Sequence, residues 1–297
     1  MKSSKLHPNI SNPPRPSRSL YGRVAIVTGA GSRASGIGNG RAAAILLAES
    51  GARVVCADLN VKWADVTVDM INEEFGPGKA ISVEADVSQE ESCKIVVDTA
   101  LNEFGRLDIL INNVGIGGPT GTAVDVDLSA WTKALDINVT SMMLMTKYAV
   151  PAMERNPPNE LSGRGSIVNM ASVAGLIGGA PMLLYPTSKG AVVNMTRAMS
   201  AHHAPSGIRV NCVCPGYLYT PMVYSGGMPD EVREARRTFS LLQTEGNGWD
   251  CGNAVRFLAS DEARWMTGVI LPVDAGLTAA DSGQSQGIPA SMTTTRI

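Results

Sequence analysis

Short apolar runs alternate along most of the chain with longer segments in which apolar residues recur every three or four positions. An apolar run rich in β-branched residues and bounded by turn residues is typical of a buried strand, and the three-to-four spacing is typical of a helix. The pattern predicts strands at 23–28, 52–58, 79–87, 107–115, 165–172, 208–216 and 268–276. It predicts helices at 40–51, 61–75, 89–104, 230–245 and 249–260, a long helical region with Trp131, Asp136 and Asn138, and a helix with Tyr185.

The regular alternation of strands and helices decides the predicted fold class. Strands separated by helices run parallel, and the helices cover both faces of the sheet. The pattern continues from about residue 22 to 277 with no linker-like stretch and no internal repeat. We therefore predict a single doubly wound α/β domain over residues 21–277, with a parallel sheet of about seven strands.

The two ends of the chain do not follow this pattern. Residues 1–20 are basic, polar and proline-rich, and they lack the apolar centre of a secretory signal. They predict a flexible N-terminal arm, with an organellar transit peptide as the alternative. Residues 278–297 are polar and predict a C-terminal tail.

The composition is that of an ordinary soluble globular protein, with 297 residues that are 44% hydrophobic and 18% charged. A net charge of −2 gives no positive surface for nucleic acid or an anionic membrane, and no apolar run is long enough to span a bilayer. The five cysteines are odd in number and scattered, so we expect a reducing, cytoplasmic environment. His202 and His203 have no third ligand at a suitable spacing, so no metal site is predicted.

A glycine-rich stretch from Thr28 to Gly38 lies between the first predicted strand and the first predicted helix. Glycines let the backbone approach a pyrophosphate closely, and the helix that follows supplies amide donors and the positive end of its dipole. An ordinary tight turn is the alternative interpretation. The position between strand and helix favours a dinucleotide site.

Acidic and amide side chains stand at the ends of the next three strands. Asp58 lies about twenty residues beyond the last loop glycine, where a carboxylate binds the ribose hydroxyls of NAD and repels the 2′-phosphate of NADP. Arg33 in the glycine-rich loop could pair with that phosphate, so NADP stays open. Asp86, before Val87, could bind the adenine amine, and the turn 113–115 could pass along the adenosine. Each of these could also be simple turn chemistry.

Ser172, Tyr185 and Lys189 form the candidate catalytic group. If Tyr185 and Lys189 lie on one helix, their spacing places them on the same face. The ammonium would then favour the phenolate and lower the tyrosine pKa from about 10 towards working pH. Tyr185 could exchange a proton with a ligand oxygen that Ser172 also holds. Pro186 is compatible with such a helix only in its first turn.

These motifs occur in one order: TG-x6-GIG, Asp86-Val87, Asn112-Asn113-Val114-Gly115, Ser172-x12-Tyr185-x3-Lys189 and Pro215-Gly216. In this combination the chain resembles the compact branch of the short-chain dehydrogenase/reductase superfamily, as far as the closing TGVILPVDAG. The resemblance implies a Rossmann domain in which Tyr185 is the general acid/base and Ser172 anchors the substrate oxygen. It also implies that Lys189 binds the nicotinamide ribose and depresses the tyrosine pKa, and that Asn138 holds a water in a proton relay. The implied cofactor residues are Gly29, Ser32, Arg33, Gly36, Ile37, Asp58, Leu59, Asp86, Val87, Asn113, Gly115, Tyr185, Lys189, Pro215, Gly216, Leu218 and Thr220.

The chain departs from the family pattern in two places. The usual glycine loop is TG-x3-GIG, and the three extra residues here leave open which loop amides meet the pyrophosphate. Val114 stands where the family commonly has alanine, a change that should not alter the chemistry.

The predicted function is the interconversion of a secondary alcohol and a ketone by an NAD(P)-dependent oxidoreductase. Asp58 favours NAD, and NAD pools usually favour oxidation, so alcohol dehydrogenase is the first hypothesis. Arg33 admits the alternative of an NADPH-dependent biosynthetic ketoreductase, and a non-catalytic cofactor-sensing regulator is a third hypothesis. The resemblance also implies a homo-oligomer, either a tetramer or a dimer.

The residues expected to face the substrate are apolar, and they predict a lipophilic terpenoid, steroid-like or polyketide alcohol or ketone. Methionine-rich stretches are also common in cores, which is the alternative. The arginines of the lid-like segment 222–244 are expected to form an exposed face with neighbouring acids, and a carboxylate clamp is the alternative. The expected substrate-facing residues are Val173, Gly179, Met182, Leu183, Tyr217, Met222 and Met228, and the charged lid residues are Asp230, Glu231, Arg233, Glu234, Arg236 and Arg237.

Overall fold

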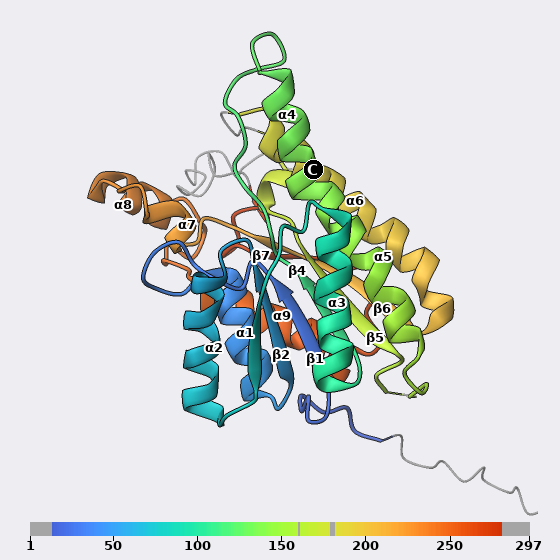
Figure 1. The fold of residues 1–297 in the computed structure, drawn as a ribbon. Coiled ribbons are helices and arrows are strands. Elements are labelled where there is room, and N and C mark those ends of the chain that lie inside the picture. The colour runs from blue at the N-terminus through green and yellow to red at the C-terminus, as the bar shows by residue number, and fades with distance from the viewer. Residues whose placement is uncertain (1–13, 160, 179–181, 281–297) are drawn as a thin grey trace, which may run out of the picture.

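The computed structural model describes residues 14–159, 161–178 and 182–280 (Figure 1). The strands in these residues are β1 (Val24–Thr28), β2 (Arg53–Asp58), β3 (Ala80–Glu84), β4 (Ile109–Asn112), β5 (Gly165–Met170), β6 (Ile208–Pro215) and β7 (Ile270–Val273). They form one parallel sheet in the order β3-β2-β1-β4-β5-β6-β7. The predicted doubly wound α/β fold with a seven-stranded sheet is confirmed.

Helices cover both faces of the sheet. One face carries α1 (Asn39–Glu49), α2 (Val61–Phe75) and α9 (Gly248–Ala259), and the other carries α3 (Glu90–Phe104), α5 (Ser141–Glu154) and α6 (Leu184–His203). In β1, Ala25 and Val27 pack into the first core, whereas Val24 and Ile26 pack into the second. A strand covered on both faces needs an apolar residue at every position, which explains why continuous apolar runs marked the strands in the sequence.

The order of the strands reverses between β1 and β4. The chain builds outward from β1 through β2 to β3, then returns to pair β4 with the free side of β1. The loops that leave β1 and β4 therefore diverge to opposite faces, and in open α/β sheets ligands bind in the crevice at such a point. The topology places a ligand site at the carboxyl ends of these two strands.

The predicted long helical region around Asn138 is present and consists of α4 (Leu128–Leu135), a π-helical turn (Asp136–Thr140) and α5, which follow one another directly. One helix prediction needs correction. The helix predicted at 230–245 is shorter, because α8 covers only Asp230–Thr238 and is preceded by the short α7 (Pro221–Tyr224). The chain turns after α8, where Gln243 has a left-handed φ of 50° that no helix accommodates.

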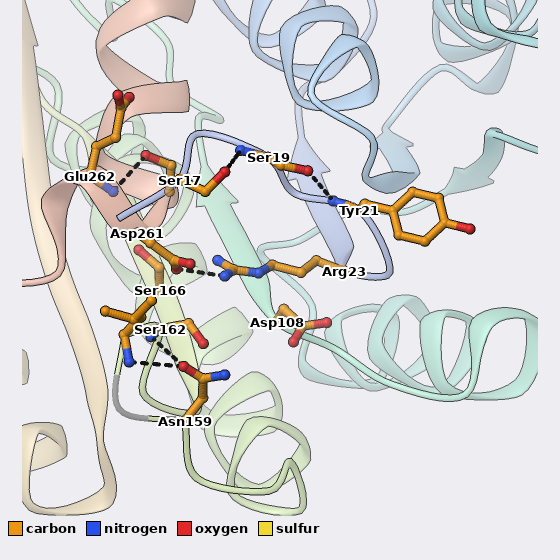
Figure 2. A network of polar contacts seen from close by, with 12 residues as sticks. Ser17, Ser19, Tyr21, Arg23, Asp108, Asn159, Ser162, Ser166, Asp261 and Glu262 are labelled. Atoms are coloured by element: carbon orange, nitrogen blue, oxygen red, sulfur yellow. Dashed lines mark hydrogen bonds and ion pairs between the residues drawn. The ribbon is translucent and has the colours of Figure 1, made fainter. Parts of the chain in front are cut away.

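Charged side chains form hydrogen bonds at the amino ends of β1 and β4, at the edge of the sheet opposite the crevice (Figure 2). Arg23, directly before β1, donates to Asp261 Oδ1 at 2.5 Å, and the two side chains point toward one another in the picture. Asp108, directly before β4, accepts a hydrogen bond from the Val24 amide at 2.9 Å and two from Arg106 at 2.6 and 2.8 Å. The Val24–Asp108 bond links the starts of β1 and β4, and the Arg23–Asp261 pair links the start of β1 to the turn at Asp261–Ala263.

The predicted tails lie mostly outside the described residues, which exclude 1–13 and 281–297. Within the predicted arm 1–20, Leu20 is fully buried, and its amide donates to Ser50 O at 2.7 Å. Leu20 therefore belongs to the packed core and not to an arm.

Candidate active site

Ser172 and Tyr185 meet at the carboxyl end of β5. Ser172 follows β5 and caps the short turn Val173–Gly175, where its Oγ accepts a hydrogen bond from the Ala174 amide at 3.2 Å. Tyr185 is the second residue of α6, and its hydroxyl lies close enough to Ser172 for that side chain to influence the tyrosine pKa. Pro186 lies in the first turn of α6, as predicted, where the backbone amide has no helical partner to lose.

Lys189 lies one turn further along α6 and is almost completely buried. Its Nζ donates to Met170 O at 2.9 Å and lies 5.8 Å from the centre of the Tyr185 ring. The neighbouring chain must be glycine to admit it: a Cβ on Gly115 would lie 2.9 Å from Nζ, and one on Gly175 would lie 2.5 Å from the Lys189 carbonyl carbon. Burial lowers the pKa of Lys189 from 10.5 to about 8.

The pKa of Tyr185 is raised above 10, and the expected lowering by Lys189 is wrong for this arrangement. Burial raises it, because a phenolate loses its hydration in the crevice, and the nearby Ser172 side chain offsets this only in part. The Lys189 ammonium is engaged by the Met170 carbonyl and not by the phenol oxygen. Tyr185 and Lys189 share one face of α6, as their spacing predicts, but the direction of the ammonium depends on the Met170 carbonyl.

Asn138 is fully buried in the π-helical turn and joins two elements of the site. Its Oδ1 accepts from the Ile116 amide at 2.8 Å, and its Nδ2 donates to Ile116 O at 2.9 Å and to Ser188 Oγ at 3.0 Å. Ser188 Oγ in turn donates to Tyr185 O at 2.8 Å. Both amide hydrogens are therefore used in holding the chain after β4 against α6, and the expected water-holding role remains a prediction.

Asp58 ends β2 beside the glycine-rich loop. Its Oδ2 accepts a hydrogen bond from the Gly31 amide at 2.9 Å, and its Oδ1 accepts one from the Asn60 amide at 3.0 Å. Each carboxylate oxygen can accept a further hydrogen bond. Asp58 can therefore stabilise the turn and still accept a hydrogen bond from a ligand next to the loop. Leu59 beside it is exposed.

The glycine-rich loop is held by the Asn113 side chain and by a hydrogen bond within the loop. Asn113, after β4, donates through Nδ2 to Thr28 O at 3.1 Å and to Gly29 O at 2.9 Å. Within the loop, Ser32 Oγ donates to Ala34 O at 2.9 Å. Arg33 is exposed, and Ile37 packs against the core shared by α1 and α9.

Arg41 is a buried loop-holding residue that sequence reasoning missed. Its side chain donates to Gly36 O at 2.7 Å, to Thr67 Oγ1 at 3.0 Å and to Trp63 O at 3.4 Å. Burial lowers its pKa, and the nearby Asp58 opposes that shift. A single arginine in an otherwise alanine- and leucine-rich helix was the available signal.

The remaining predicted cofactor residues lie at the same edge of the sheet. Asp86 is half-buried and accepts from the Ser88 amide and hydroxyl at 3.0 and 2.6 Å, beside the buried Val87. After β6, a Cβ on Gly216 would lie 2.8 Å from Asp274 Cα, so this turn also requires glycine. The other members of this segment are Pro215 in β6, the buried Leu218, and Thr220 at the start of α7.

The lid segment differs in part from its predicted arrangement. Arg237 pairs with Glu234 as expected, with N–O distances of 2.6 and 2.7 Å. Arg233 instead forms a two-pronged pair with Glu245 and lies 3.9 Å from the centre of the Tyr219 ring. Arg233 is thus held by partners outside α8, because the chain folds back after this helix.

The expected substrate-facing residues are partly exposed near the start of α6. Val173 is buried, Leu183 and Tyr217 are exposed, and Met182 is half-buried. Gly179 lies outside the described residues.

His202 and His203 lie edge to face, with ring centres 6.3 Å apart, and the described residues contain no group of three or more histidine, cysteine or acidic side chains that could hold a metal. None of the described helices is both long and apolar enough to cross a bilayer.

Comparison with known proteins extends the similarity over most of the chain. A family model described as enoyl-(acyl carrier protein) reductase matches residues 31–278. The cis-4-hydroxycyclohexanecarboxylate dehydrogenase of Sinomonas cyclohexanicum is 39% identical over 257 residues, which cover 86% of this chain and 97% of that protein. The (−)-trans-carveol dehydrogenase of Rhodococcus erythropolis is 36% identical, with 87% and 98% of the two chains covered.

A solved structure agrees with these relatives. The crystal structure of levodione reductase matches with a TM-score of 0.80 at 28% identity, over 88% of this chain and 99% of that one. With the family model and two named dehydrogenases each matching well over half of its length, the chain belongs to the short-chain dehydrogenase/reductase superfamily, a family of oxidoreductases that bind NAD(P).

Proposed function

We propose that this protein is an NAD-dependent dehydrogenase that interconverts a lipophilic secondary alcohol, carried on a ring, and its ketone. The names of two relatives denote dehydrogenases of ring alcohols, and that of a structural neighbour denotes a reductase of levodione. The apolar side chains of Val173, Met182 and Leu183, which lie close in sequence to Ser172 or Tyr185, support a ligand of this kind.

The observation that carries this proposal is that Tyr185 lies near Ser172 at the carboxyl end of β5, with Lys189 buried one turn away. The hydroxyl groups of Ser172 and Tyr185, lying near each other, can both form hydrogen bonds with a single substrate oxygen. Their place at the carboxyl ends of the strands is where this type of sheet binds ligands.

The residues present fit a bound dinucleotide. Helix α1 begins at Asn39 without a side-chain cap, which leaves the amides of its first turn to an anionic pyrophosphate. A Cβ on Gly31 would lie 2.5 Å from Trp63 Cβ and 2.8 Å from Asp58 Oδ2, so only glycine allows the loop to follow this path. The dinucleotide would supply or accept the hydride.

The side chains of this protein would handle the proton. The raised pKa of Tyr185 keeps its Oη protonated near neutral pH, ready to donate to a ketone oxygen that Ser172 Oγ also holds. Oxidation of an alcohol requires the reverse transfer to a phenolate. The ammonium of Lys189, whose pKa is about 8, favours that phenolate when it approaches the phenol oxygen.

The preference for NAD rests on Asp58, because a second negative charge next to its carboxylate is unfavourable. The exposed Arg33 on the glycine-rich loop supports a second candidate, an NADPH-dependent ketoreductase. Titration of the protein with NAD and NADP separates the two, and tighter binding of NADP would overturn the argument from Asp58.

The test of the activity is a panel of cyclic secondary alcohols and ketones, followed through the absorbance of the reduced nicotinamide. Turnover should fall by at least about 100-fold in Tyr185→Phe, which removes the proton donor. Tyr21→Phe, at the opposite edge of the sheet, is the matched control and should retain turnover, since Tyr21 is exposed. Full turnover by Tyr185→Phe would refute the mechanism.

We also propose a cytoplasmic location and a homo-oligomer. The five cysteines are free and buried, which suits a reducing compartment. The family resemblance supports assembly through α5, α6 and β7. Light scattering of the purified chain measures the oligomeric state, and a monomer would contradict this part of the proposal.

A further inference from the structure

The lid segment contacts the glycine-rich loop through Tyr224. Tyr224, the last residue of α7, donates from its hydroxyl to Ser35 O at 2.8 Å. These residues are 189 positions apart in the sequence. Ser35 lies in the part of the loop that is longer than the family pattern, so the extra residues bring a carbonyl within reach of the lid.

The loop is shaped for this contact. Gly36 has a φ of 117°, and a Cβ there would lie 2.1 Å from Tyr224 Oη. Arg41 donates to Gly36 O at 2.7 Å from the other side. The loop is therefore held between a buried cation on α1 and a phenol on the lid, and only glycine at position 36 allows both contacts.

On the lid side, Tyr224 is connected to α8. Its ring lies 4.7 Å from that of Tyr219, and the guanidinium of Arg233 stacks on the other tyrosine at 3.9 Å. Arg233 is fixed by two hydrogen bonds of 2.6 Å to Glu245. The hydroxyl of Tyr224 is thus carried by a braced group of side chains and not by a freely rotating tyrosine.

We propose that Tyr224 is a positioning residue for the dinucleotide, because its bond to Ser35 O latches the lid onto the loop that would surround the pyrophosphate. The inference rests on the proposed function. Opening the lid must break this bond, so the latch slows release of the dinucleotide. Tyr224 does not touch the reacting atoms, so the latch acts on cofactor exchange and not on proton transfer.

The test is the rate at which NADH leaves the full-length protein, measured by stopped-flow after displacement with excess NAD. Tyr224→Phe keeps the ring and removes the hydrogen bond. Its NADH should leave roughly five-fold faster, the factor that corresponds to one net hydrogen bond. Two controls should release NADH at the wild-type rate: Tyr219→Phe, which keeps the stacked ring, and Tyr21→Phe, which removes an exposed hydroxyl at the opposite edge of the sheet.

The outcomes separate the latch from the function. Faster release by Tyr224→Phe alone supports the latch. Equal release by Tyr224→Phe and both controls, with NADH still bound, overturns the latch and leaves the proposed dehydrogenase intact. If the wild-type protein binds neither NADH nor NADPH, both the latch and the proposed function are wrong. A structural defect in Tyr224→Phe would also raise the KM for the alcohol and lower kcat. The latch predicts neither of these changes, so the two cases can be told apart.

Discussion

Replacing Lys189 by methionine tests whether a charged ammonium is buried under the site. Methionine keeps the length and apolar stem of the side chain and cannot titrate. The wild-type Nζ is nearly inaccessible and has the Met170 carbonyl as its hydrogen-bond acceptor. Because burial lowers the pKa of Lys189 from 10.5 to about 8, the folded protein holds this charge at a cost in unfolding free energy.

The sign and size of the effect follow from the two pKa values. Below pH 8 the ammonium is charged in both states, and the folded state bears the full cost. As the pH rises through 8 towards 10.5, the folded protein loses the proton before the unfolded chain does, so the cost disappears. Between pH 7 and 9.5, the wild-type unfolding free energy should therefore rise by about 2 kcal/mol relative to that of Lys189→Met.

Urea unfolding of both proteins at several pH values in this range measures the difference. Taking the difference cancels the contributions of Cys56, Cys93 and Cys251, which both proteins share and whose pKa values do not depend on Lys189. Lys133→Met, at an exposed position on α4, serves as the matched control and should give a difference that does not change with pH. A constant difference for Lys189→Met as well would refute the claim that the buried ammonium is charged at neutral pH.

Three further predictions concern the chemistry, the loop and the amino edge of the sheet. Tyr185→Phe should bind NADH with a Kd within about two-fold of the wild type while losing turnover. The reason is that removing the hydroxyl abolishes proton transfer but takes away little cofactor affinity. A large loss of NADH affinity would contradict the assignment of Tyr185 as the proton donor. Gly31→Ala should weaken NADH binding by at least about ten-fold in a fluorescence titration, because its Cβ would meet Trp63 Cβ at 2.5 Å and the Trp63 backbone at 2.8 Å. Gly117→Ala, with no heavy atom within 4 Å of the new Cβ, is its control and should bind normally. Asp108→Ala should lower the unfolding free energy by about 1–3 kcal/mol in urea, since it leaves the Val24 amide without its acceptor; an unchanged midpoint would show that the edge network is not stabilising.

Much of the fold and of the candidate site could be predicted from the sequence because it depends on local pattern. Continuous apolar runs such as residues 24–28 are required wherever both faces of a strand are covered, so the seven strands could be located. The helical repeat placed Tyr185 and Lys189 on one face, and the first turn of α6 accommodates Pro186. The ends of a helix are harder to predict when the helix has no buried face. Helix α8 buries none of its residues, and its C-terminal end was predicted too far along the chain.

The sequence by itself determined which residues stand at the carboxyl ends of the strands, because parallel strands joined by helices bring those ends to one edge. Only the tertiary structure decided what these residues contact. The direction of the Lys189 ammonium towards Met170 O, the raised pKa of Tyr185 and the bond from Tyr224 to Ser35 O depend on burial and on contacts between distant segments. The local spacing of residues determines neither burial nor the distance between elements, since both arise only when the helices pack on the sheet.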